Sequence, residues 1–255
     1  MARLAMSLVY QKNIWRLKSL RQEFSMFKRK TIFDDGYQDY LVEGANFEGL
    51  DGIPCLMDFH NAEIPSKLTP FSKAKTCKQK NGYIHFYEHD INFYRILTST
   101  KNYIDLLKQF DGVITPDPSI IIGKSRCLHA TSTYMNRAVG YYLQKNGIPV
   151  IANVRWGDKS TYDFAFSGIP KHSIVCVSTH GAIKKDASNN NYLRHCFKDG
   201  LKEMLNRIEP ITVLVYGYMP NDIFGDFIDK YNFKRFPSDF ETSHNGKEAY
   251  NGHKL

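Results

Sequence analysis

The sequence predicts an α/β fold built on a mostly parallel sheet of six or seven strands. Short apolar runs of strand length alternate with longer stretches of helical periodicity, and polar residues gather at one end of the strand-like runs. Alternating strand and helix units rich in Val and Ile indicate a parallel sheet covered by helices. The pattern fits an irregular (β/α) barrel or an open doubly wound sheet, and we slightly favour the barrel.

The expected elements follow one another in a regular order. The runs interpreted as strands are 53–58, 83–87, 112–115, 148–154, 173–179 and 211–217, with a weaker one at 233–236. The helices expected between them are 91–110, 127–146, 160–167, 190–208 and 221–231. Gly-Ile-Pro occurs at 52–54, 147–149 and 168–170, each time just before a strand or its lead-in. Gly can end the preceding element in a left-handed conformation, and Pro is tolerated where a strand starts.

The chain is expected to have three parts. Residues 1–48 hold a basic N-terminal helix and a connection, residues 49–236 the α/β domain, and residues 237–255 a polar C-terminal tail. Residues 1–30 carry eight Lys or Arg against one acid, Glu23. Such a helix either packs one face on the domain and leaves a solvated basic face, or contacts nucleic acid or an anionic surface. The side chains expected to make that contact are Lys12, Arg16, Arg21, Lys28, Arg29 and Lys30.

Composition limits the class of protein. The chain has 255 residues, 42% of them hydrophobic, which is ample material for a packed core. No run approaches the roughly 18 apolar residues of a membrane span, and no apolar leader with a cleavage site opens the chain, so we expect a cytoplasmic protein. The five cysteines contain no CxxC pair, which argues against a disulfide framework or a zinc ribbon. The net charge of +8 permits a nucleic-acid partner without demonstrating one.

Polar and ionisable residues follow the carboxyl ends of the expected strands, whereas the opposite ends begin with Gly, Pro or Lys. In parallel α/β folds the loops after the carboxyl ends form the ligand site. In strand order, the residues at these ends are Asp58 and His60; Glu88, His89 and Asp90; Asp117; Asn153, Arg155, Trp156 and Asp158; Ser178, Thr179 and His180; and Tyr216 and Tyr218.

Four of these residues are candidates for catalysis, each with a structural alternative. Asp117 lies between two prolines, where a rigid carboxylate serves as a general base, a metal ligand or a turn cap. Arg155 suits a phosphate or carboxylate, or forms an ion pair with Asp117 or Asp158. His180 precedes a Gly that can expose backbone donors to an anion, and is otherwise a hydrogen-bonded structural histidine. Asp90 is either functional or the N-cap of the following helix.

Four further residues are candidates for ligand binding: Trp156, Asn153, Ser178 and Tyr216. Trp156 is either a stacking platform or a lid over the core.

A metal site is not assigned, although His60 with Glu88 and Asp90 offers oxygen and nitrogen ligands. No cofactor is identified, because the sequence lacks GxxxxGK[ST], HExxH, GxSxG and a GxGxxG that opens a helix.

Several segments together resemble a known family. They are His-Phe-Tyr-Glu-His-Asp with the following Phe (85–93), Pro-Asp-Pro-Ser (116–119), Asn-Arg with Tyr-Tyr and Gly-Ile-Pro-Val-Ile (136–151), Asn-Val-Arg-Trp-Gly (153–157), Gly-Ile-Pro-Lys (168–171) and Ser-Thr-His-Gly (178–181). The resemblance is to a "domain of unknown function" family of phages, plasmids and other mobile elements of Gram-positive bacteria. It covers residues 48–236 and implies a mobile-element context, which favours nucleic acid or nucleotides as the substrate class.

Two functional hypotheses follow. The first is an enzyme-like α/β protein that acts on a phosphorylated ligand, a nucleotide or nucleic acid, at the carboxyl ends of its strands. The alternative is a non-catalytic factor that binds nucleic acid or protein through the basic N-terminal helix, with the strand-end charges acting as ordinary ion pairs. The oligomeric state is left open.

Overall fold

The structure, a computed structural model, describes residues 38–58, 63–183 and 191–242. The chain divides into two units, residues 1–38 and 39–255, and the second contains the elements described below. The basic residues expected to contact nucleic acid lie in 1–37, outside the described residues.

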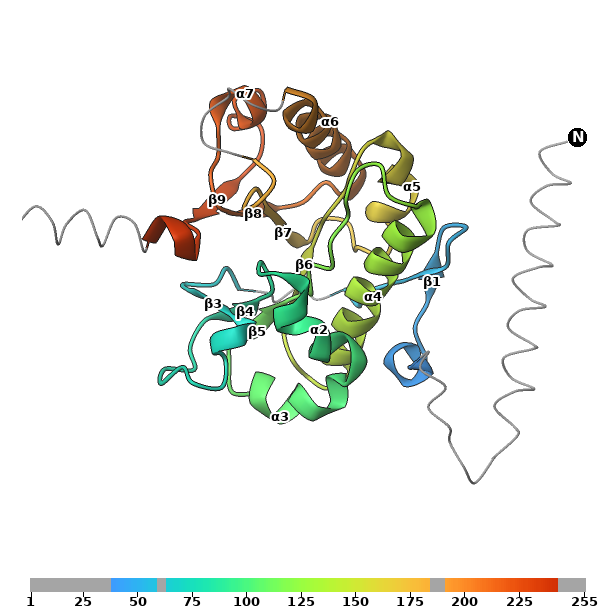
Figure 1. Cartoon of the computed structure of the whole chain (residues 1–255), viewed down its shortest axis with the longest axis vertical. Coiled ribbons are helices and arrows are strands. Elements are labelled where there is room, and N and C mark those ends of the chain that lie inside the picture. The colour runs from blue at the N-terminus through green and yellow to red at the C-terminus, as the bar shows by residue number, and fades with distance from the viewer. Residues whose placement is uncertain (1–37, 59–62, 184–190, 243–255) are drawn as a thin grey trace, which may run out of the picture. The chain divides into compact units, whose positions relative to one another are not determined.

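A seven-stranded parallel sheet forms the centre of the described domain (Figure 1). Its strands are β3 (Leu68–Pro70), β4 (Tyr83–His85), β5 (Gly112–Ile114), β6 (Val150–Asn153), β7 (Ile174–Ser178), β8 (Thr212–Tyr216) and β9 (Phe233–Phe236). Each strand pairs in parallel with the next one along the chain. This sequential order is that of a (β/α) barrel, whereas a doubly wound sheet reverses order at a switch point. The sheet curls but stays open, with β3 and β9 as its edges.

The helices follow one another around the outside of the strands (Figure 1). They are α2 (Asp90–Thr98), α3 (Ile104–Leu107), α4 (Arg126–Lys145), α5 (Tyr162–Ala165), α6 (Asn191–Ile208) and α7 (Asn221–Phe224), with 3-10 turns η1 (Asp39–Val42), η2 (Phe71–Lys73), η3 (Thr100–Tyr103) and η4 (Lys159–Thr161). Parallel crossovers are almost always right-handed, so a sequential strand order brings successive helices to the same face.

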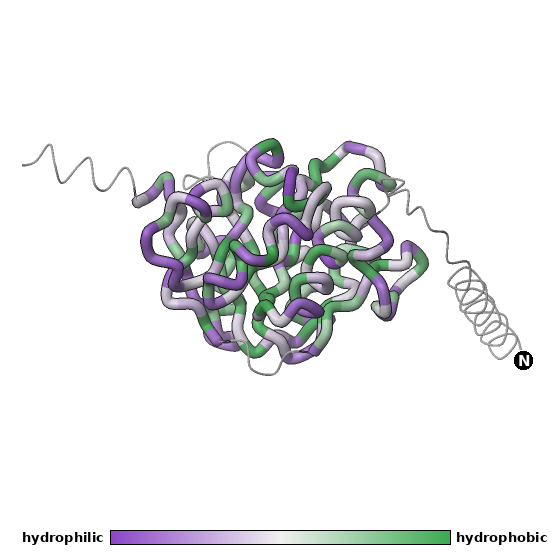
Figure 2. The backbone as a smooth tube through the Cα atoms, turned by 90° about the horizontal axis from the view of Figure 1, so that it is seen from below, coloured by the Kyte–Doolittle hydropathy of each residue, from purple (hydrophilic) through white to green (hydrophobic). Residues whose placement is uncertain are grey.

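The outer, convex face of the sheet packs against these helices in two clusters. One joins Val113 and Val150 to Ala138 and Leu143 of α4 and to residues of α2 and α3. The other joins strand residues of β6, β7 and β8 to α5 and α6, as Val175 with Leu201. Figure 2 shows hydrophobic stretches gathered inside the domain and hydrophilic ones at its periphery. Apolar packing against the helices therefore holds the convex face of the sheet in place.

The inner, concave face of the sheet packs largely against itself. Its apolar cluster consists of residues on the strands or directly after them, including Tyr83, Ile114 and Leu214. The rings of Tyr87, just after β4, and Tyr216 of β8 stack with centroids 4.9 Å apart although three strands separate β4 from β8. The curl of the sheet is what brings them together.

The two edge strands approach each other without pairing. Lys234 Nζ in β9 donates to the carbonyl of Pro65 at 3.2 Å, just before β3. Lys73 Nζ, after β3, forms an ion pair with Asp239 at 2.8 Å, after β9. Side chains thus bridge the gap between β3 and β9, which we call the seam. In a closed barrel, backbone hydrogen bonds would join these two strands.

The strand expected at 53–58 is wrong for the main sheet. Only β2 (Ile53–Pro54) is a strand there, and it pairs antiparallel with β1 (Phe47–Glu48) in a separate two-stranded sheet. The first part of the segment is nevertheless buried, because Ile53 and Leu56 pack into the core and the Leu56 amide bonds to the carbonyl of Gly168, whereas Met57 and Asp58 are exposed. The first strand of the main sheet is the unexpected β3.

Three expected helices are also shorter than the sequence suggested, and the one at 160–167 consists of η4 followed by the four-residue α5. The helix expected at 91–110 breaks into α2, η3 and α3, and Thr100 Oγ1 bonds to the carbonyl of Ile96 at the break. The helix expected at 221–231 is limited to α7, after which the chain continues in turns. The break does not separate their packing, because buried residues on both sides of it, Phe93 and Leu107 among them, belong to one cluster.

The first residues of the expected C-terminal tail pack on the domain. Glu241 Oε1 accepts hydrogen bonds from the amide and hydroxyl of Ser238, and both residues are buried. Across the described residues, no helix is both long and apolar enough to cross a membrane.

Candidate functional site

Asp117, just after β5, lies at the centre of the polar groups at the carboxyl end of the sheet. Its Oδ1 accepts a hydrogen bond from Asn153 Nδ2 at 2.8 Å, and its Oδ2 accepts one from Arg155 Nη1 at 2.7 Å. Asn153 ends β6 and Arg155 follows two residues later, so the alternation of an extended chain turns both side chains to the same face. Asp117 is 7% exposed and Arg155 28%, which makes this a partly buried ion pair.

The environment of Asp117 acts on its carboxyl group in two directions. Burial raises its pKa, while the charge of Arg155 and the hydrogen bond from Asn153 act to lower it, and the net direction is upward. A carboxylate removed from water binds a proton more readily than an exposed one, even beside a cation. Asp117 is therefore a better proton acceptor than an ordinary surface aspartate.

A residue that follows a third strand, β4, extends the hydrogen-bond network of Asp117 and Arg155. Tyr87, after β4, donates its hydroxyl hydrogen to Asn153 Oδ1 at 3.1 Å. Burial raises the pKa of Tyr87 well above its usual value, so the phenol stays protonated and remains a donor. The amide of Asn153 is thereby fixed, with Oδ1 facing Tyr87 and Nδ2 facing Asp117. The network holds the carboxylate in one orientation.

Helix α4 holds the same strand ends from the convex side. Asn136 Nδ2 donates to the carbonyl of Pro116 at 2.6 Å, and Arg137 Nη1 donates to the carbonyl of Asn153 at 3.0 Å. Arg137 Nε and Nη2 bond to the carbonyls of Ser167 and Ala165. Burial lowers the pKa of Arg137 to about 9, which leaves it charged at neutral pH.

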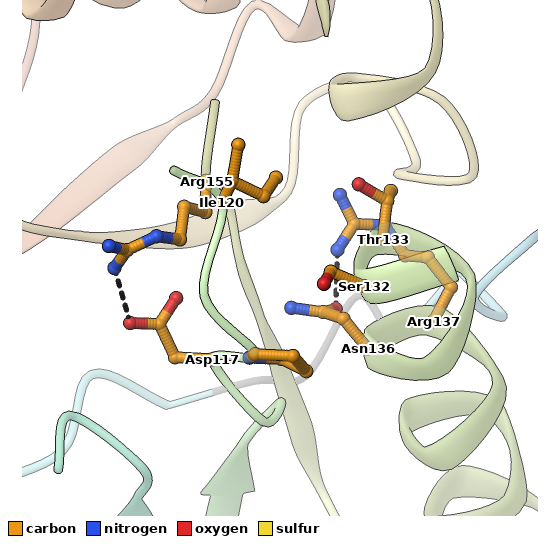
Figure 3. Close-up of a pocket in the computed structure, with 8 residues that line it drawn as sticks. Asp117, Ile120, Ser132, Thr133, Asn136, Arg137 and Arg155 are labelled. Atoms are coloured by element: carbon orange, nitrogen blue, oxygen red, sulfur yellow. Dashed lines mark hydrogen bonds and ion pairs between the residues drawn. The ribbon is translucent and has the colours of Figure 1, made fainter. Parts of the chain in front are cut away.

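Figure 3 shows Asp117 and Arg155 facing each other on one side of a small hollow, with Asn136 and Arg137 of α4 on the other. This hollow has a volume of about 10 Å³, room for roughly one water molecule. It lies between the ion pair and the helix that supports it.

A larger cavity of about 240 Å³ opens beside the same ion pair. Small-molecule sites generally have volumes of roughly 300–1,000 Å³, so this cavity falls just below that range. Its polar lining comes from Asp117, Asn153, Arg155 and Ser178. Its apolar lining comes from Ile120, Ile121, Ile122, Val154, Trp156, Ala182, Ile183, Leu193 and Phe197, and Gly157, Gly181 and Cys196 complete it. A few convergent polar groups in a mainly apolar cavity are typical of a ligand site.

Asp90 and His180 differ from Asp117 and Arg155 in their position. Asp90 opens α2, but its carboxylate bonds to the amide and hydroxyl of Ser119, at 3.1 and 2.9 Å, and so braces the loop after β5. Its negative charge acts to raise the pKa of Asp117. His180 is exposed, lies edge-on to Tyr216 at 5.8 Å and is not part of the cavity lining.

Of the four expected ligand-binding residues, three line the cavity and Tyr216 does not. Asn153 and Ser178 line the cavity. Trp156 also lines it, but it is buried: it packs on Phe197 and donates its Nε1 hydrogen to the carbonyl of Cys196 at 3.3 Å. Tyr216 faces the concave side among His85 and Tyr87.

The remaining strand-end residues make local contacts. Glu88 bonds to the amide and hydroxyl of Ser72, and Asp158 caps the turn at Ser160. Among the described residues, no group of three or more His, Cys, Asp or Glu side chains is placed to hold a metal ion. His60 lies outside the described residues.

Sequence reasoning missed two groups of residues at this site. Asn136 and Arg137 were noted only as part of a family motif, although a charged residue within an apolar helix pattern signals a buried contact. His85 and Tyr87 alternate with apolar residues in the Tyr-Ile-His-Phe-Tyr run, and this alternation puts both on the concave face with Tyr83.

The geometry defines a class of protein: an open, curled parallel α/β sheet with a buried carboxylate–arginine pair beside a cavity at its carboxyl ends. The family model described as "Domain of unknown function (DUF4417)" matches residues 45–234, so the chain belongs to this family. The resemblance noted from the sequence is thereby confirmed.

The chain is also similar to two phage proteins. It is 30% identical to the Gene 1 protein of Mycobacterium phage L5 over 141 residues, which are 55% of this chain and 59% of that protein. It is 29% identical to the Gene 1 protein of Mycobacterium phage D29 over 136 residues, 53% of this chain and 48% of that protein. The chain thus spans about half the length of the curated relatives it matches. No solved structure matches the chain.

Proposed function

We propose that the 240 Å³ cavity binds a phosphorylated ligand, a nucleotide or a nucleotide unit of nucleic acid, and that the protein acts on it in an enzyme-like way. The observation that carries the proposal is the Asp117–Arg155 pair in the wall of the cavity, joined by a single hydrogen bond rather than two. Arginine can bind carboxylates and phosphates through two nitrogens at once. Arg155 therefore keeps donors for a phosphate while Asp117 holds it in place.

The lining around the pair suits the rest of such a ligand. Ile122, Leu193 and Phe197 give an apolar surface for a base or another flat group, and Ser178 supplies a hydroxyl. The similarity to phage proteins supports nucleic acid or nucleotides as the ligand class.

Two residues have roles in this proposal and two support them. Arg155 binds the phosphate, and Asp117 accepts a proton from the ligand or from a water, since burial raises its pKa. Asn153 positions Asp117 from the neighbouring strand. Asp90 positions the loop that carries Asp117, through Ser119.

Opposite effects of two conservative variants test the proposal. Arg155→Gln removes the cation and should weaken the binding of adenosine monophosphate or inorganic phosphate by about tenfold or more, the usual size of a charge-assisted hydrogen bond. Asp117→Asn removes the charge that competes for Arg155 and should strengthen the binding of both anions. Arg126→Gln is the matched control, because Arg126 pairs with Asp51 and Asp163 and does not line the cavity. Calorimetric titration of the full chain gives the affinities.

Labelling of Cys196 gives a second measurement that reports on the cavity itself. Cys196 lines the cavity and is buried, so a bound ligand should slow its reaction with a thiol reagent. Cys77→Ser and Cys127→Ser remove two more accessible thiols from the background. If neither anion binds, or if Arg155→Gln and Asp117→Asn leave affinity and labelling unchanged, the cavity is not the ligand site.

The alternative function rests on the eight basic residues of 1–30. It predicts nucleic-acid binding that falls steeply with salt and is lost when residues 1–30 are deleted, while Arg155→Gln has no effect. Binding to DNA and RNA measured at several salt concentrations, with both variants, separates the two functions.

A further inference from the structure

Thr133 of α4 has a buried hydroxyl without a hydrogen-bond partner among the described residues. The residue is 4% exposed and lines the hollow of about 10 Å³ between α4 and the Asp117–Arg155 pair. Figure 3 shows Thr133 on the α4 side of this hollow, across from the ion pair. Buried polar atoms are rarely left unpaired, so the hydroxyl indicates a partner that belongs in the hollow.

This hydroxyl does not use the partner that its own helix offers. In an α-helix the hydroxyl of a threonine can bond to the carbonyl three or four residues earlier. Thr131 of the same helix does so, because its Oγ1 donates to the carbonyl of Cys127 at 2.8 Å. Thr133 makes no such bond. Its hydroxyl hydrogen is therefore available to a group outside the helix.

The carboxylate of Asp117, on the other side of the hollow, can accept further hydrogen bonds. A carboxylate has room for about four, and Asp117 accepts one from Asn153 and one from Arg155. The hydroxyl of Ser132, which also lines the hollow, already donates to a backbone carbonyl at 3.2 Å. Thr133 and Asp117 are therefore a donor and an acceptor with unused capacity on opposite sides of one hollow.

The size and the charges of the hollow favour a neutral occupant. Its volume of about 10 Å³ is enough for roughly one water molecule. Its charged lining consists of the guanidinium groups of Arg137 and Arg155 and the carboxylate of Asp117. A cation would meet two like charges there, and an anion would lie against the carboxylate. Water is neutral and both accepts and donates hydrogen bonds.

We propose that one water molecule occupies this hollow, where it accepts the hydroxyl hydrogen of Thr133 and donates a hydrogen to the carboxylate of Asp117. Thr133 is then a positioning residue, which ties α4 to the carboxylate through the water. A hydrogen bond donated to a carboxylate favours its charged form, so the water opposes the effect of burial on Asp117. The water position needs no ligand, whereas its effect on activity rests on the proton-accepting role proposed for Asp117.

A high-resolution crystal structure of the full chain tests the water directly. Density for one water is expected at about 2.5–3.0 Å from Thr133 Oγ1 and from an oxygen of Asp117. Thr133→Val keeps the branched shape of the side chain and should lose this water, whereas Thr133→Ser keeps the hydroxyl and should retain it. Thr131→Val is the matched control, because Thr131 is exposed on the same helix and does not line the hollow, so the water should remain.

The titration of Asp117 gives a readout that a merely structural role of Thr133 would not change. Carbon nuclear magnetic resonance follows the carboxyl groups, and the Asp117 signal is assigned by its loss in Asp117→Asn. Thr133→Val should raise the midpoint of this titration by roughly half to one pH unit, the equivalent of one hydrogen bond. Thr133→Ser should restore the midpoint, and Thr131→Val should leave it unchanged. The charges that act on Asp117, those of Arg155 and Asp90, are the same in all three variants.

Three outcomes would overturn the proposal. A hollow without density, with the Thr133 hydroxyl bonded to the carbonyl of His129, would mean that the helix itself satisfies the hydroxyl. An ion identified in the hollow by anomalous scattering would replace the water. A water that remains in Thr133→Val, or an Asp117 titration that this variant leaves unchanged, would mean that Thr133 does not act through it. None of these measurements uses a phosphate, so their failure is distinguishable from a failure of the cavity proposal.

Discussion

The two faces of the curled sheet are built in opposite ways. The convex face packs against helices in two apolar clusters, and Val113, Val175 and Val213 are among its strand residues. The concave face is apolar along the strands, where Ile114 and Leu214 belong to one cluster. It becomes polar at the carboxyl ends, which display carboxylate, guanidinium, imidazole and phenol groups.

The difference separates the residues that stabilise the domain, on the convex side, from those that could bind a ligand, on the concave side. On the convex side Arg137 is buried, and apart from one bond to its neighbour Asn136 it donates to the backbone carbonyls of Asn153, Ala165 and Ser167. The charged residues of the concave side, Asp117 and Arg155, bond to side chains and face a cavity. We therefore expect substitutions on the convex side to cost stability, and those on the concave side to alter binding.

The largest expected effect is that of Arg137→Ala. The variant removes the Arg137 donors to the buried carbonyls of Ala165 and Ser167 and one of two side-chain donors to the carbonyl of Asn153, so it should lower the free energy of unfolding by about 3–5 kcal/mol. Urea denaturation measures this. Arg126→Ala is the matched control at an exposed ion pair and should cost about 1 kcal/mol or less. Equal costs for the two variants would show that the convex network is not what holds the strand ends.

Gly200→Ala should have a smaller effect on the same face. A Cβ at Gly200 in α6 would lie 2.0 Å from Trp156 Nε1, so the indole must move. Overpacking of this kind costs about 1–3 kcal/mol. Lys202→Ala, at an exposed position of the same helix, should be close to neutral. Thermal denaturation followed by Trp fluorescence measures both, and an unperturbed Gly200→Ala would show that Trp156 has room to shift.

Asp117→Asn should change stability least, and with a distinctive dependence on pH. Because the pKa of Asp117 is raised in the folded state, its contribution to stability is fully present below the unfolded pKa and is lost as pH rises through the folded value. The asparagine has no such loss, so the variant should gain stability relative to the unaltered protein as pH rises from acid to neutral. Urea denaturation across this range tests the sign. A relative loss of the variant with rising pH would mean that Arg155 outweighs burial.

Much of the sheet could be predicted because most of its strands lie in short apolar runs bounded by polar or Gly and Pro residues. The runs at 83–87, 112–115, 148–154, 173–179, 211–217 and 233–236 contain β4 to β9. The strand β3 escaped prediction because it has only three residues and ends in Pro70, which an edge strand tolerates and a sequence pattern does not reveal. The run at 53–58 looks like a strand because it is apolar, yet an apolar run does not specify which backbone it pairs with.

The candidate site was predictable in its location more than in its partners. The rule that ligands bind at carboxyl ends placed Asp117 and Arg155 together, and their ion pair was one of the alternatives considered. Asp90 looked like a helix cap because it precedes a helix, but its carboxylate reaches Ser119, 29 positions away. The amide of Tyr87 donates to His85 Nδ1, and this contact depends on the local backbone geometry, which composition and spacing do not contain.

The open seam leaves two sheet edges at which copies of the molecule could pair with each other. A strand at the edge of a sheet exposes unpaired amides and carbonyls that can template pairing with another chain. Here β3 is short and ends in Pro70, while β9 carries Lys234 and Arg235. Lys234 reaches across the seam to the carbonyl of Pro65, and Arg235 bonds to Glu241. Charged side chains therefore line the β9 edge. Both edges are therefore poor templates for pairing with a second copy of the sheet, although the sheet stays open.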